Sequence, residues 1–387
     1  MARLGDVCDI LNGFAFKSEQ YVDDGIRIIR IANVQKGYIE DSTPVFYPID
    51  NKDAKKYSLE EGDMLMSLTG NVGRVAKLSK EFLPAALNQR VACLRIKDGV
   101  ALDKAFLFNL LNSDYFEQQC IAASKGVAQK NMSTEWLKEY EIPMFSLKQQ
   151  KVIASVLDKV TELITLRKEQ LAKLDQLAKS RFIELFGDPV VNPKSWETAP
   201  LSALIINANN GMARRGKDED GNIVLRLVEL QNGFIDYSAP NRICLNETEK
   251  KRYELVDNDF LFARVNGNPD YVGRCAVFKS IEEPVFHNDH IIRVHFDETK
   301  INGCFTSVLL NSDYGKRQMR EQIKTSAGQY TISQDGIGAI MAILPPLELQ
   351  KQFATFVEQT EKSKLAIQQS LDKLELLKKS LMQEYFG

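Results

Sequence analysis

The feature that most constrains this chain is a forty-one-residue stretch that occurs twice, at Leu147–Gly187 and again at Leu347–Gly387. Aligned without gaps at an offset of 200, the two copies share thirteen identical residues. Neither copy contains proline, and each has glycine only at its last position, so each can form one unbroken helix. In the first copy, apolar residues recur at steps of three and four or their sums, which indicates a single apolar stripe.

A helix of about 38 residues is roughly 57 Å long, which is more than a globular domain can cover. Pairing the two helices with each other is the simplest way to bury both stripes. An antiparallel pair would return the chain to the first globular region and place the two globular regions at opposite ends of the pair, related by an approximate two-fold axis. A parallel pair would send the second helix into solvent, so we expect the antiparallel arrangement.

The repeat extends into the regions that precede each helix. Ile29–Ile39 parallels Leu225–Ile235 at an offset of 196, and both are predicted to form an apolar strand, a glycine turn and a second strand. Val72–Arg74 then matches Val272–Arg274 at an offset of 200, so the second copy has four additional residues within Val265–Tyr271. Each half of the chain is therefore a globular domain followed by a long helix.

The predicted fold class is α+β, because each globular region combines short strands with few long helices. Two tandem globular domains, at residues 1–144 and 188–343, are separated by long helices at residues 145–187 and 344–387. These helices form an antiparallel coiled coil in a pseudo-two-fold internal repeat. The first helix is expected to stop at Gly187, because glycine can end a helix and Pro189 cannot continue one.

Composition sets bounds on the class of protein. The length of 387 residues suits two domains, and six cysteines without a CxxC pair indicate reduced, buried thiols rather than a zinc site or disulfides. The N-terminus lacks the apolar core of a signal peptide and no segment reaches 18 unbroken apolar residues, so we expect a cytoplasmic protein without a membrane partner. The formal net charge of −2 does not indicate a nucleic-acid binder, so evidence for that role has to come from local charge.

Several short segments accompany the tandem plan. They are Phe186–Pro189 followed by Asn192–Glu197, Asp259–Arg264 with Gly273 and Arg274, and Leu344–Gln350 at the start of the second helix. Taken together, and over essentially the whole chain, they resemble the specificity (S) subunit of type I restriction–modification enzymes. The first helix departs from this pattern, with Phe145 and Ser146 where the second has Pro345 and Pro346.

The resemblance implies a function for each part of the chain. Each globular region would be a target recognition domain that reads one part of a split sequence in double-stranded DNA. The helices would set the unread spacer and dock two methyltransferase (M) subunits. S-adenosylmethionine, ATP and magnesium would be bound by the M subunits and by restriction (R) subunits, and the chain itself would have no cofactor and no catalytic centre.

Known catalytic motifs are incomplete in this sequence. Gly211–Asp218 has the GxxxxGK spacing of a P-loop but ends in aspartate, where a serine or threonine hydroxyl is needed to hold magnesium. Asn192-Pro193 and Asn268-Pro269 lack the second proline and the aromatic ring of the adenine methyltransferase signature. A stand-alone enzyme is therefore disfavoured.

The three histidines, His287, His290 and His295, fall within nine residues and invite a metal-site interpretation. Strand alternation after His290 would place His295 on the opposite face of the strand. A polar, partly exposed cluster near a DNA-facing loop is the favoured interpretation, and no metal site is predicted.

Candidate DNA-binding residues lie in the loops that align between the two copies. Lysine and arginine bind phosphates, whereas bidentate side chains read base edges. The aligned loops differ in side chains, as expected if they read different half-sites, although each residue could instead belong to a solvated surface loop. Arg74 and Arg274 are expected to pair with an internal carboxylate or a phosphate. The candidates are Phe14, Phe16, Lys17, Thr69, Asn71, Arg74, Arg90, Lys130, Asn131, Arg214, Arg215, Lys217, Arg264, Asn266, Asn268, Tyr271, Arg274, Asn288, His290, Gln329 and Tyr330.

A second hypothesis is a helical scaffold that joins two protein-binding domains and does not bind DNA. Salt dependence separates the two hypotheses. DNA binding through several phosphates weakens steeply as ionic strength rises, whereas assembly through apolar helix faces does not.

Overall fold

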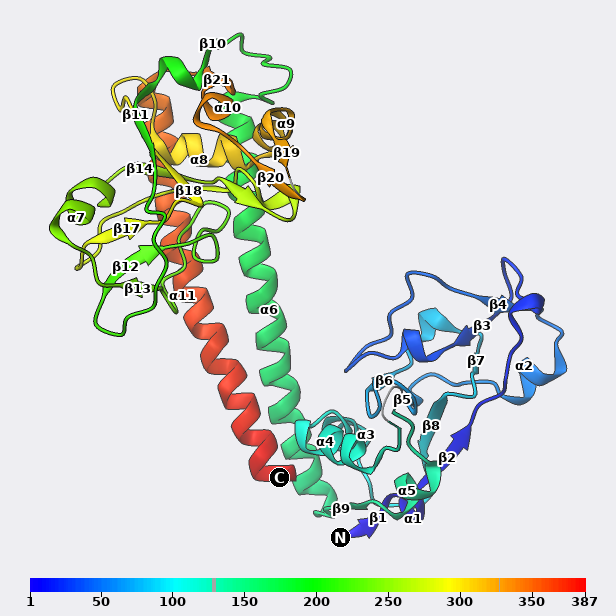
Figure 1. The fold of residues 1–387 in the computed structure, drawn as a ribbon. Coiled ribbons are helices and arrows are strands. Elements are labelled where there is room, and N and C mark those ends of the chain that lie inside the picture. Colours follow the sequence, from blue (N-terminus) through cyan, green and yellow to red (C-terminus); the bar gives the residue numbers. More distant parts are fainter. Residues whose placement is uncertain (127–129, 327) are drawn as a thin grey trace. The chain divides into compact units, whose positions relative to one another are not determined.

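The computed structural model describes residues 1–126, 130–326 and 328–387. The chain divides into two compact units, which we call unit 1 (Met1–Glu169 with Ile367–Gly387) and unit 2 (Gln170–Ala366). The two long helices are α6 (Leu147–Phe186) and α11 (Leu347–Phe386), and each contributes one part to each unit (Figure 1). The two long helices predicted from the repeat are therefore confirmed.

Unit 1 has a four-stranded antiparallel sheet in the order β2-β8-β5-β6 and a three-stranded sheet in the order β4-β3-β7, in which β3 runs parallel to β7. The strands are β1 (Ala2–Arg3), β2 (Cys8–Asn12), β3 (Ile26–Ile29), β4 (Phe46–Tyr47), β5 (Met64–Ser67), β6 (Val75–Lys77), β7 (Ala85–Leu87), β8 (Val91–Ile96) and β9 (Glu141–Ile142). The helices are α1 (Leu4–Val7), α2 (Lys52–Lys56), α3 (Lys104–Leu111), α4 (Asp114–Ala123) and α5 (Thr134–Glu139).

Unit 2 repeats both sheets, in the orders β11-β18-β14-β16 and β13-β12-β17, and adds a small sheet in the order β15-β20-β19. The strands are β10 (Glu197–Pro200), β11 (Ile205–Asn210), β12 (Asn222–Leu225), β13 (Arg242–Ile243), β14 (Asp259–Ala263), β15 (Val265–Asn266), β16 (Cys275–Val277), β17 (Val285–His287), β18 (Ile291–Phe296), β19 (Lys324–Ser326), β20 (Gln329–Thr331) and β21 (Met341–Leu344). The helices are α7 (Glu247–Tyr253), α8 (Gly303–Asn311), α9 (Asp313–Gln322) and α10 (Gln334–Gly338). The α+β class and the internal repeat are confirmed.

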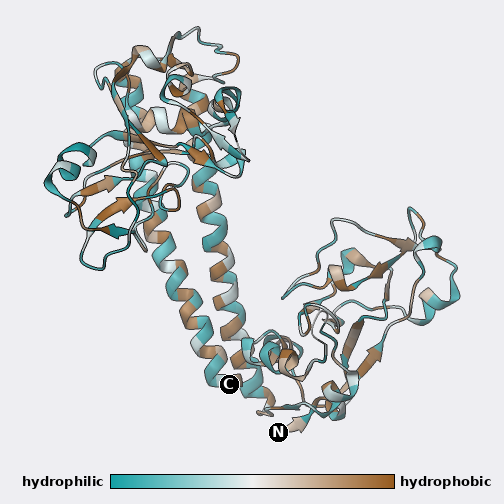
Figure 2. Cartoon of the chain, viewed as in Figure 1, coloured by the Kyte–Doolittle hydropathy of each residue, from teal (hydrophilic) through white to brown (hydrophobic). Residues whose placement is uncertain are grey.

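The long helices pair antiparallel within each unit. In unit 1 the last turn of α11 reaches the start of α6, because Phe386 shares a core with Ile153 and packs 5.4 Å from Phe106. In unit 2 the last turn of α6 reaches the start of α11, with Phe186 4.8 Å from Phe305 and 5.4 Å from Phe353, as ring-centroid distances. Each helix therefore completes the core of a globular region. Figure 2 shows the strands mainly in hydrophobic brown and α6 and α11 in alternating brown and teal, as expected for helices buried on one side.

The two helices begin in the same way despite their different preceding residues. The fully buried amide groups of Gln150 and Gln350 each donate from Nε2 to a carbonyl just before the helix, that of Phe145 or of Pro345, at 2.8 Å. Their Oε1 atoms accept from the backbone N–H of Asp103 at 2.7 Å and of Asn302 at 2.8 Å. A glutamine thus fixes each helix start, whether or not prolines precede it.

The end of α6 follows the prediction. Gly187 has a φ of +79° and donates its N–H to the Ile183 carbonyl at 2.8 Å, as in a left-handed helix cap. A Cβ atom at this position would lie 2.6 Å from Pro193 Cγ, so both the conformation and the space require glycine.

One expectation about local structure was wrong in both units. The segments after β3 and β12 do not form a second strand, and have only the single bridges Val34–Ile39 and Leu230–Ile235 around their glycine turns. Hydrogen bonds from side chains take the place of backbone hydrogen bonds between strands. Asn33 Oδ1 accepts from the backbone N–H of Arg30, and the Glu229 carboxylate accepts from the backbone N–H of Arg226.

The cysteines were expected to be buried. Cys8, Cys93, Cys120 and Cys275 are buried, but Cys304 is half-buried and Cys244 is exposed, because Cys244 lies just beyond the short edge strand β13. All six are free thiols. Within the described residues, no helix is both long enough and apolar enough to cross a membrane.

Candidate nucleic-acid interface

Three segments meet at equivalent places in the two units. We call them the convergent loops: residues 13–17, 68–71 and 88–90 in unit 1, and residues 211–217, 264–268 and 288–290 in unit 2. In unit 1, Phe14 forms a β-bridge with Asn88, and Leu68 donates its N–H to the Arg90 carbonyl at 3.0 Å. The predicted candidates in these loops, though far apart in sequence, therefore lie close together.

Unit 2 repeats these backbone contacts. Met212 forms the same bridge with Asn288, and Arg264 donates its N–H to the His290 carbonyl at 2.8 Å. The close approach requires glycine in both units, since a Cβ on Gly13 would lie 2.2 Å from Asn88 O and one on Gly211 would lie 2.3 Å from Asn288 O. The backbone of the convergent loops is thus common to both units.

A fourth segment joins each set. In unit 1, Thr69 bridges Asn131, and Gly70 donates to the Lys130 carbonyl at 2.9 Å. In unit 2, β15 pairs with β20, which brings Asn266 opposite Tyr330 and Gln329 close by. The candidates that precede each long helix therefore lie beside the convergent loops.

In unit 1 the convergent loops are partly apolar. Phe14 stacks on Tyr57 at 5.4 Å, and Phe16, only 8% exposed, packs edge-on against Tyr47 at 4.7 Å. Phe16 is thus a core residue, which leaves little of its ring for a ligand. The exposed candidates of unit 1 are Lys17, Asn71, Arg90, Lys130 and Asn131, whereas Thr69 is buried.

In unit 2 the equivalent first loop is basic, and its two arginines differ. Arg214 donates Nε and Nη2 to the two carboxylate oxygens of Glu249 at 3.0 and 2.9 Å, and Nη2 also donates to the Cys244 carbonyl. The hydrogen bond from Arg214 holds the pKa of Glu249 below its usual value. Lys217, the third basic candidate of this loop, is exposed. Arg214 is therefore already used within the fold.

Arg215 instead points toward the turn at 288–290. Its Nη2 lies 2.6 Å from Asp289 Oδ1 and 3.1 Å from His290 Nε2. Burial lowers the pKa of His290, and the positive charges of Arg215 and Arg264 lower it further, against the opposite effect of Asp289. The imidazole is therefore neutral at pH 7 and can accept a hydrogen bond from the arginine.

The four-residue insertion of unit 2 is held by its own side chains. Asn266 Oδ1 accepts from the N–H of Asn268 at 2.9 Å, and Asn268 Oδ1 accepts from that of Asp270 at 3.0 Å, which caps the 3₁₀ helix Pro269–Tyr271. Asp270 is paired with Arg320 of α9 at 2.6 Å. The insertion is therefore held both by its own side chains and by α9.

Among the residues that the structure describes, neither Arg74 nor Arg274 pairs with a carboxylate, so that part of the expectation was wrong. Their Nη1 atoms donate to the amide oxygens of Gln35 and Gln231, which lie in the glycine turns of the two units. The Arg274 guanidinium also lies 3.8 Å above the Tyr271 ring. These arginines tie the glycine turn to the residues that directly precede β6 in unit 1 and β16 in unit 2.

The histidines do not form the predicted polar, partly exposed cluster. His287 is fully buried, with Nδ1 3.1 Å from the Tyr253 carbonyl, and burial lowers its pKa to about 4. His295 bonds to the buried Asp259 at 3.0 Å. The three rings belong to three separate environments, because β17 ends at His287 and β18 begins after His290. The described residues contain no group of three metal ligands.

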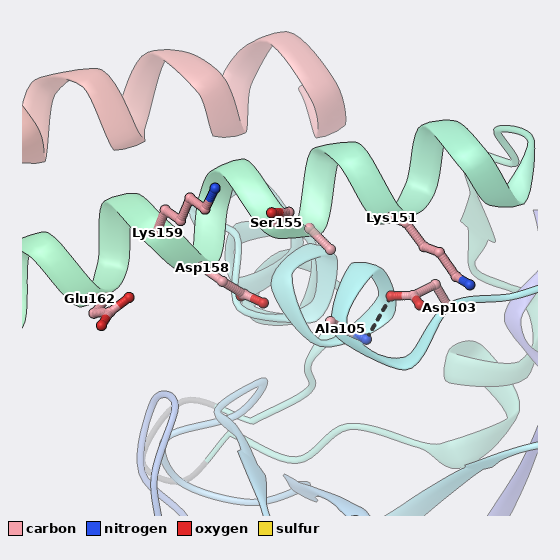
Figure 3. A pocket seen from close by; sticks show the side chains of 8 residues that line it. Asp103, Ala105, Lys151, Ser155, Asp158, Lys159 and Glu162 are labelled. Atoms are coloured by element: carbon pink, nitrogen blue, oxygen red, sulfur yellow. Dashed lines mark hydrogen bonds between the residues drawn. The ribbon is translucent and has the colours of Figure 1, made fainter.

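Two other places concern ligand binding, the P-loop-like segment Gly211–Asp218 and a pocket on α6. Asp218 accepts from the Cys244 N–H at 2.8 Å and is followed by a turn into β12, so the P-loop-like segment leads into a strand and not into a helix. In unit 1, a shallow pocket of about 310 Å³ lies along α6 at the start of α3 (Figure 3). Its charged lining residues, Asp103, Lys151, Asp158, Lys159 and Glu162, are of both signs, and Asp103 already caps α3.

Sequence reasoning missed Gln89 and Asp289, which lie in the convergent loops beside the predicted candidates. The signal was present, because Asn88-Gln89-Arg90 aligns with Asn288-Asp289-His290 at the offset of 200. A change from an amide to a carboxylate between two equivalent loops marks a position where the two units differ in chemistry.

Comparison with known proteins gives a consistent result. The family model for the type I restriction modification DNA specificity domain matches residues 1–176. The chain is 28% identical over 376 residues to the type I restriction enzyme StySPI specificity subunit of Salmonella potsdam, covering 92% of this chain and 81% of that protein. It is 30% identical over 128 residues to the C-terminal part of a putative type I specificity protein of Mycoplasma pneumoniae, covering 33% of this chain and 81% of that sequence. The type I S subunit from M. genitalium shares the fold, with a TM-score of 0.62 at 16% identity over 100% of this chain and 95% of that one.

Proposed function

We propose, from the premise that this chain belongs to the family of type I restriction–modification specificity subunits, that its units 1 and 2 each read one half of a bipartite DNA target. The observation that carries the proposal is the pair of convergent loops. Their backbone contacts are the same in both units, whereas their side chains differ, as with Leu68 and Arg264 or Gln89 and Asp289. A shared scaffold with different side chains suits two different half-sites.

The long helices support a proposal about partners. Lys173, Leu177, Ser180 and Glu184 are exposed on α6 at steps of four, three and four, so they share one helix face. Identical residues recur, also exposed, on α11 at 373, 377, 380 and 384. An exposed stripe that the fold does not need but that is present twice suits two copies of the same partner, which we take to be the M subunit.

The leucines in the last turns of α11 have two different roles. Leu371 is 5% exposed and Leu381 packs against the core of unit 1, whereas Leu377 is 45% exposed. We assign Leu377 and its counterpart Leu177 to the partner. In this proposal the chain is non-catalytic, the helices set the spacer, and S-adenosylmethionine, ATP and magnesium are bound by the M and R subunits.

The test of function is a map of DNA methylation in a host with and without this gene. A split motif of modified adenines that disappears with the gene supports the proposal. Unchanged methylation, together with binding to protein partners that is insensitive to salt, would support the scaffold hypothesis instead.

The test of docking uses the repeated stripe. Leu177→Glu and Leu377→Glu should each remove one M subunit from the complex on gel filtration, because each places a charge in an apolar contact. Leu376→Glu is the matched control, since Leu376 is 69% exposed but has Gln176 as its counterpart. An intact complex with both stripe variants would place docking elsewhere.

A further inference from the structure

Arg264 and Leu68 occupy the same backbone position in the two units. Each donates its N–H across the convergent loops, to His290 or to Arg90, and each accepts at its carbonyl, from the N–H of Ile332 or Met132, at 2.9 Å. The side chain alone differs. Leu68 is 8% exposed and buried in the core of unit 1, whereas Arg264 is half-buried.

The Arg264 guanidinium is held at one end. Its Nη1 donates to the Asp289 carbonyl at 3.2 Å, and no other hydrogen bond or ion pair of this side chain is found among the described residues. Among the described residues, the Nε and Nη2 atoms of Arg264 do not belong to the buried atoms that lack a partner. These two groups are therefore open to solvent. A planar guanidinium held at one nitrogen presents two parallel N–H donors in a defined direction.

The neighbouring carboxylate already has a cationic partner. Arg215 occupies the Asp289 carboxylate at 2.6 Å and contacts His290. Arg264 is thus not neutralised by Asp289, although it lies beside it, and it keeps both its charge and its free donors. Arg214, by contrast, has its Nε and Nη2 committed to Glu249.

From this geometry, and on the basis of the proposed function, we propose that Arg264, positioned by the Asp289 carbonyl, reads a guanine in the major groove of the half-site bound by unit 2. Guanine presents two adjacent acceptors there, O6 and N7, which match two parallel N–H groups. Adenine places its N6 amino donor beside N7, so one of the two arginine N–H groups would face a donor instead of an acceptor. Unit 1 makes no such contact, because Leu68 has no donor.

A base contact accounts for the difference between the units better than a phosphate contact. Phosphates are the same in both half-sites, so a phosphate-binding position has no reason to be arginine in one unit and a buried leucine in the other. A position that reads a base is expected to carry different side chains in the two units whenever the two half-sites differ in sequence.

The experiment uses the full chain assembled with its M subunits and a target defined by the methylation map. Each guanine of the unit 2 half-site is replaced, one at a time, by 7-deazaguanine, which lacks the N7 acceptor. One replacement should weaken binding by the wild-type complex roughly 5- to 150-fold. The same replacement should have no effect on the Arg264→Leu complex, which copies the side chain that unit 1 accommodates at this position.

Two further variants make the result specific. Arg264→Lys keeps the charge but lacks the rigid planar pair of donors, so its response to 7-deazaguanine should be smaller than that of the wild type. Arg252→Leu removes an exposed arginine of α7 in the same unit and should keep the response. For replacements in the half-site of unit 1, the change in binding should be the same for all three variants as for the wild type.

The proposal is overturned if Arg264→Leu responds to every replacement as the wild type does, or if the unit 2 half-site contains no guanine. It is also overturned if Arg264→Leu weakens binding to all sequences equally with a salt slope smaller by about 0.9, since that describes a phosphate contact. Failure of the proposed function is a different result, in which the assembled complex prefers no bipartite sequence at all.

Discussion

Units 1 and 2 share the backbone of the convergent loops and differ in the side chains that it carries. In unit 1 the first loop places Phe14 and Phe16 in a hydrophobic cluster, whereas in unit 2 the same loop carries Arg214 and Arg215. The second loop of unit 2 is longer and is ordered by its own asparagines, among them Asn268. The comparison teaches that glycines and backbone hydrogen bonds define the scaffold, so that side chains are free to define what it binds.

The largest expected effect tests which unit is stabilised by the last turn of each long helix. Phe386→Ala should destabilise unit 1 and Phe186→Ala should destabilise unit 2, each by about 3–5 kcal/mol, because each ring is buried in the core of that unit. Hydrogen exchange measured by mass spectrometry gives the local stability of each unit. Leu376→Ala, at an exposed position, is the control. A loss confined to unit 1 on changing Phe186 would contradict the antiparallel packing.

The second prediction concerns a difference between the two units in their stability in acid. His287 is buried and uncharged with a pKa of about 4, against an ordinary value of 6.5, while its counterpart in unit 1 is Leu87. Between these values the unfolded chain binds the proton and the folded unit does not, so stability falls as pH decreases from 6.5 to 4. The expected loss in unit 2 is on the order of 3 kcal/mol.

His287→Leu should remove this acid sensitivity, because it copies Leu87. The measurement is the urea midpoint against pH, followed by the fluorescence of Trp196 in a Trp136→Phe background, since the chain has one tryptophan in each unit. Equal acid sensitivity before and after the substitution would show that other groups cause it.

The third prediction concerns a feature that the units share. Gln150→Ala and Gln350→Ala should each cost about 1–3 kcal/mol, because each leaves a buried N–H and a carbonyl without a partner. Hydrogen exchange at the backbone amides of Asp103 and Asn302 is the direct measurement. Similar losses in the two units would confirm that both helix starts depend on this glutamine, and a loss in only one would break the equivalence.

The smallest effect concerns the surface of the helix pair. Lys168 and Glu375 form an ion pair at 2.9 Å with side chains 58% and 49% exposed. Lys168→Ala should cost less than about 1 kcal/mol, and the cost should disappear in high salt. A larger loss in thermal unfolding would mean that charged contacts, rather than the apolar stripe, hold the helices together.

The sequence repeat was sufficient to predict the long helices, the α+β class and the tandem plan. It also located the convergent loops, because glycines recur in both copies and an insertion marks the second copy. It did not predict the fate of particular polar side chains. Arg214 and Arg215 are neighbours of the same type, yet one is paired with Glu249 on α7 and the other contacts Asp289 and His290. Their partners lie 35 and 75 residues away for Glu249 and His290, so no local pattern reveals them.

What the sequence determined by itself is periodicity and duplication, since the spacing of apolar residues along a helix and the recurrence of glycine turns are local properties that survive without knowledge of neighbours. What only the tertiary structure decided is which polar groups remain free to bind. His287 and Arg264 show the two extremes, one fully buried and one held at a single nitrogen with its other donors open to solvent. The physical reason is that a hydrogen bond or ion pair depends on where distant segments bring their partners, and that placement exists only after the chain has folded.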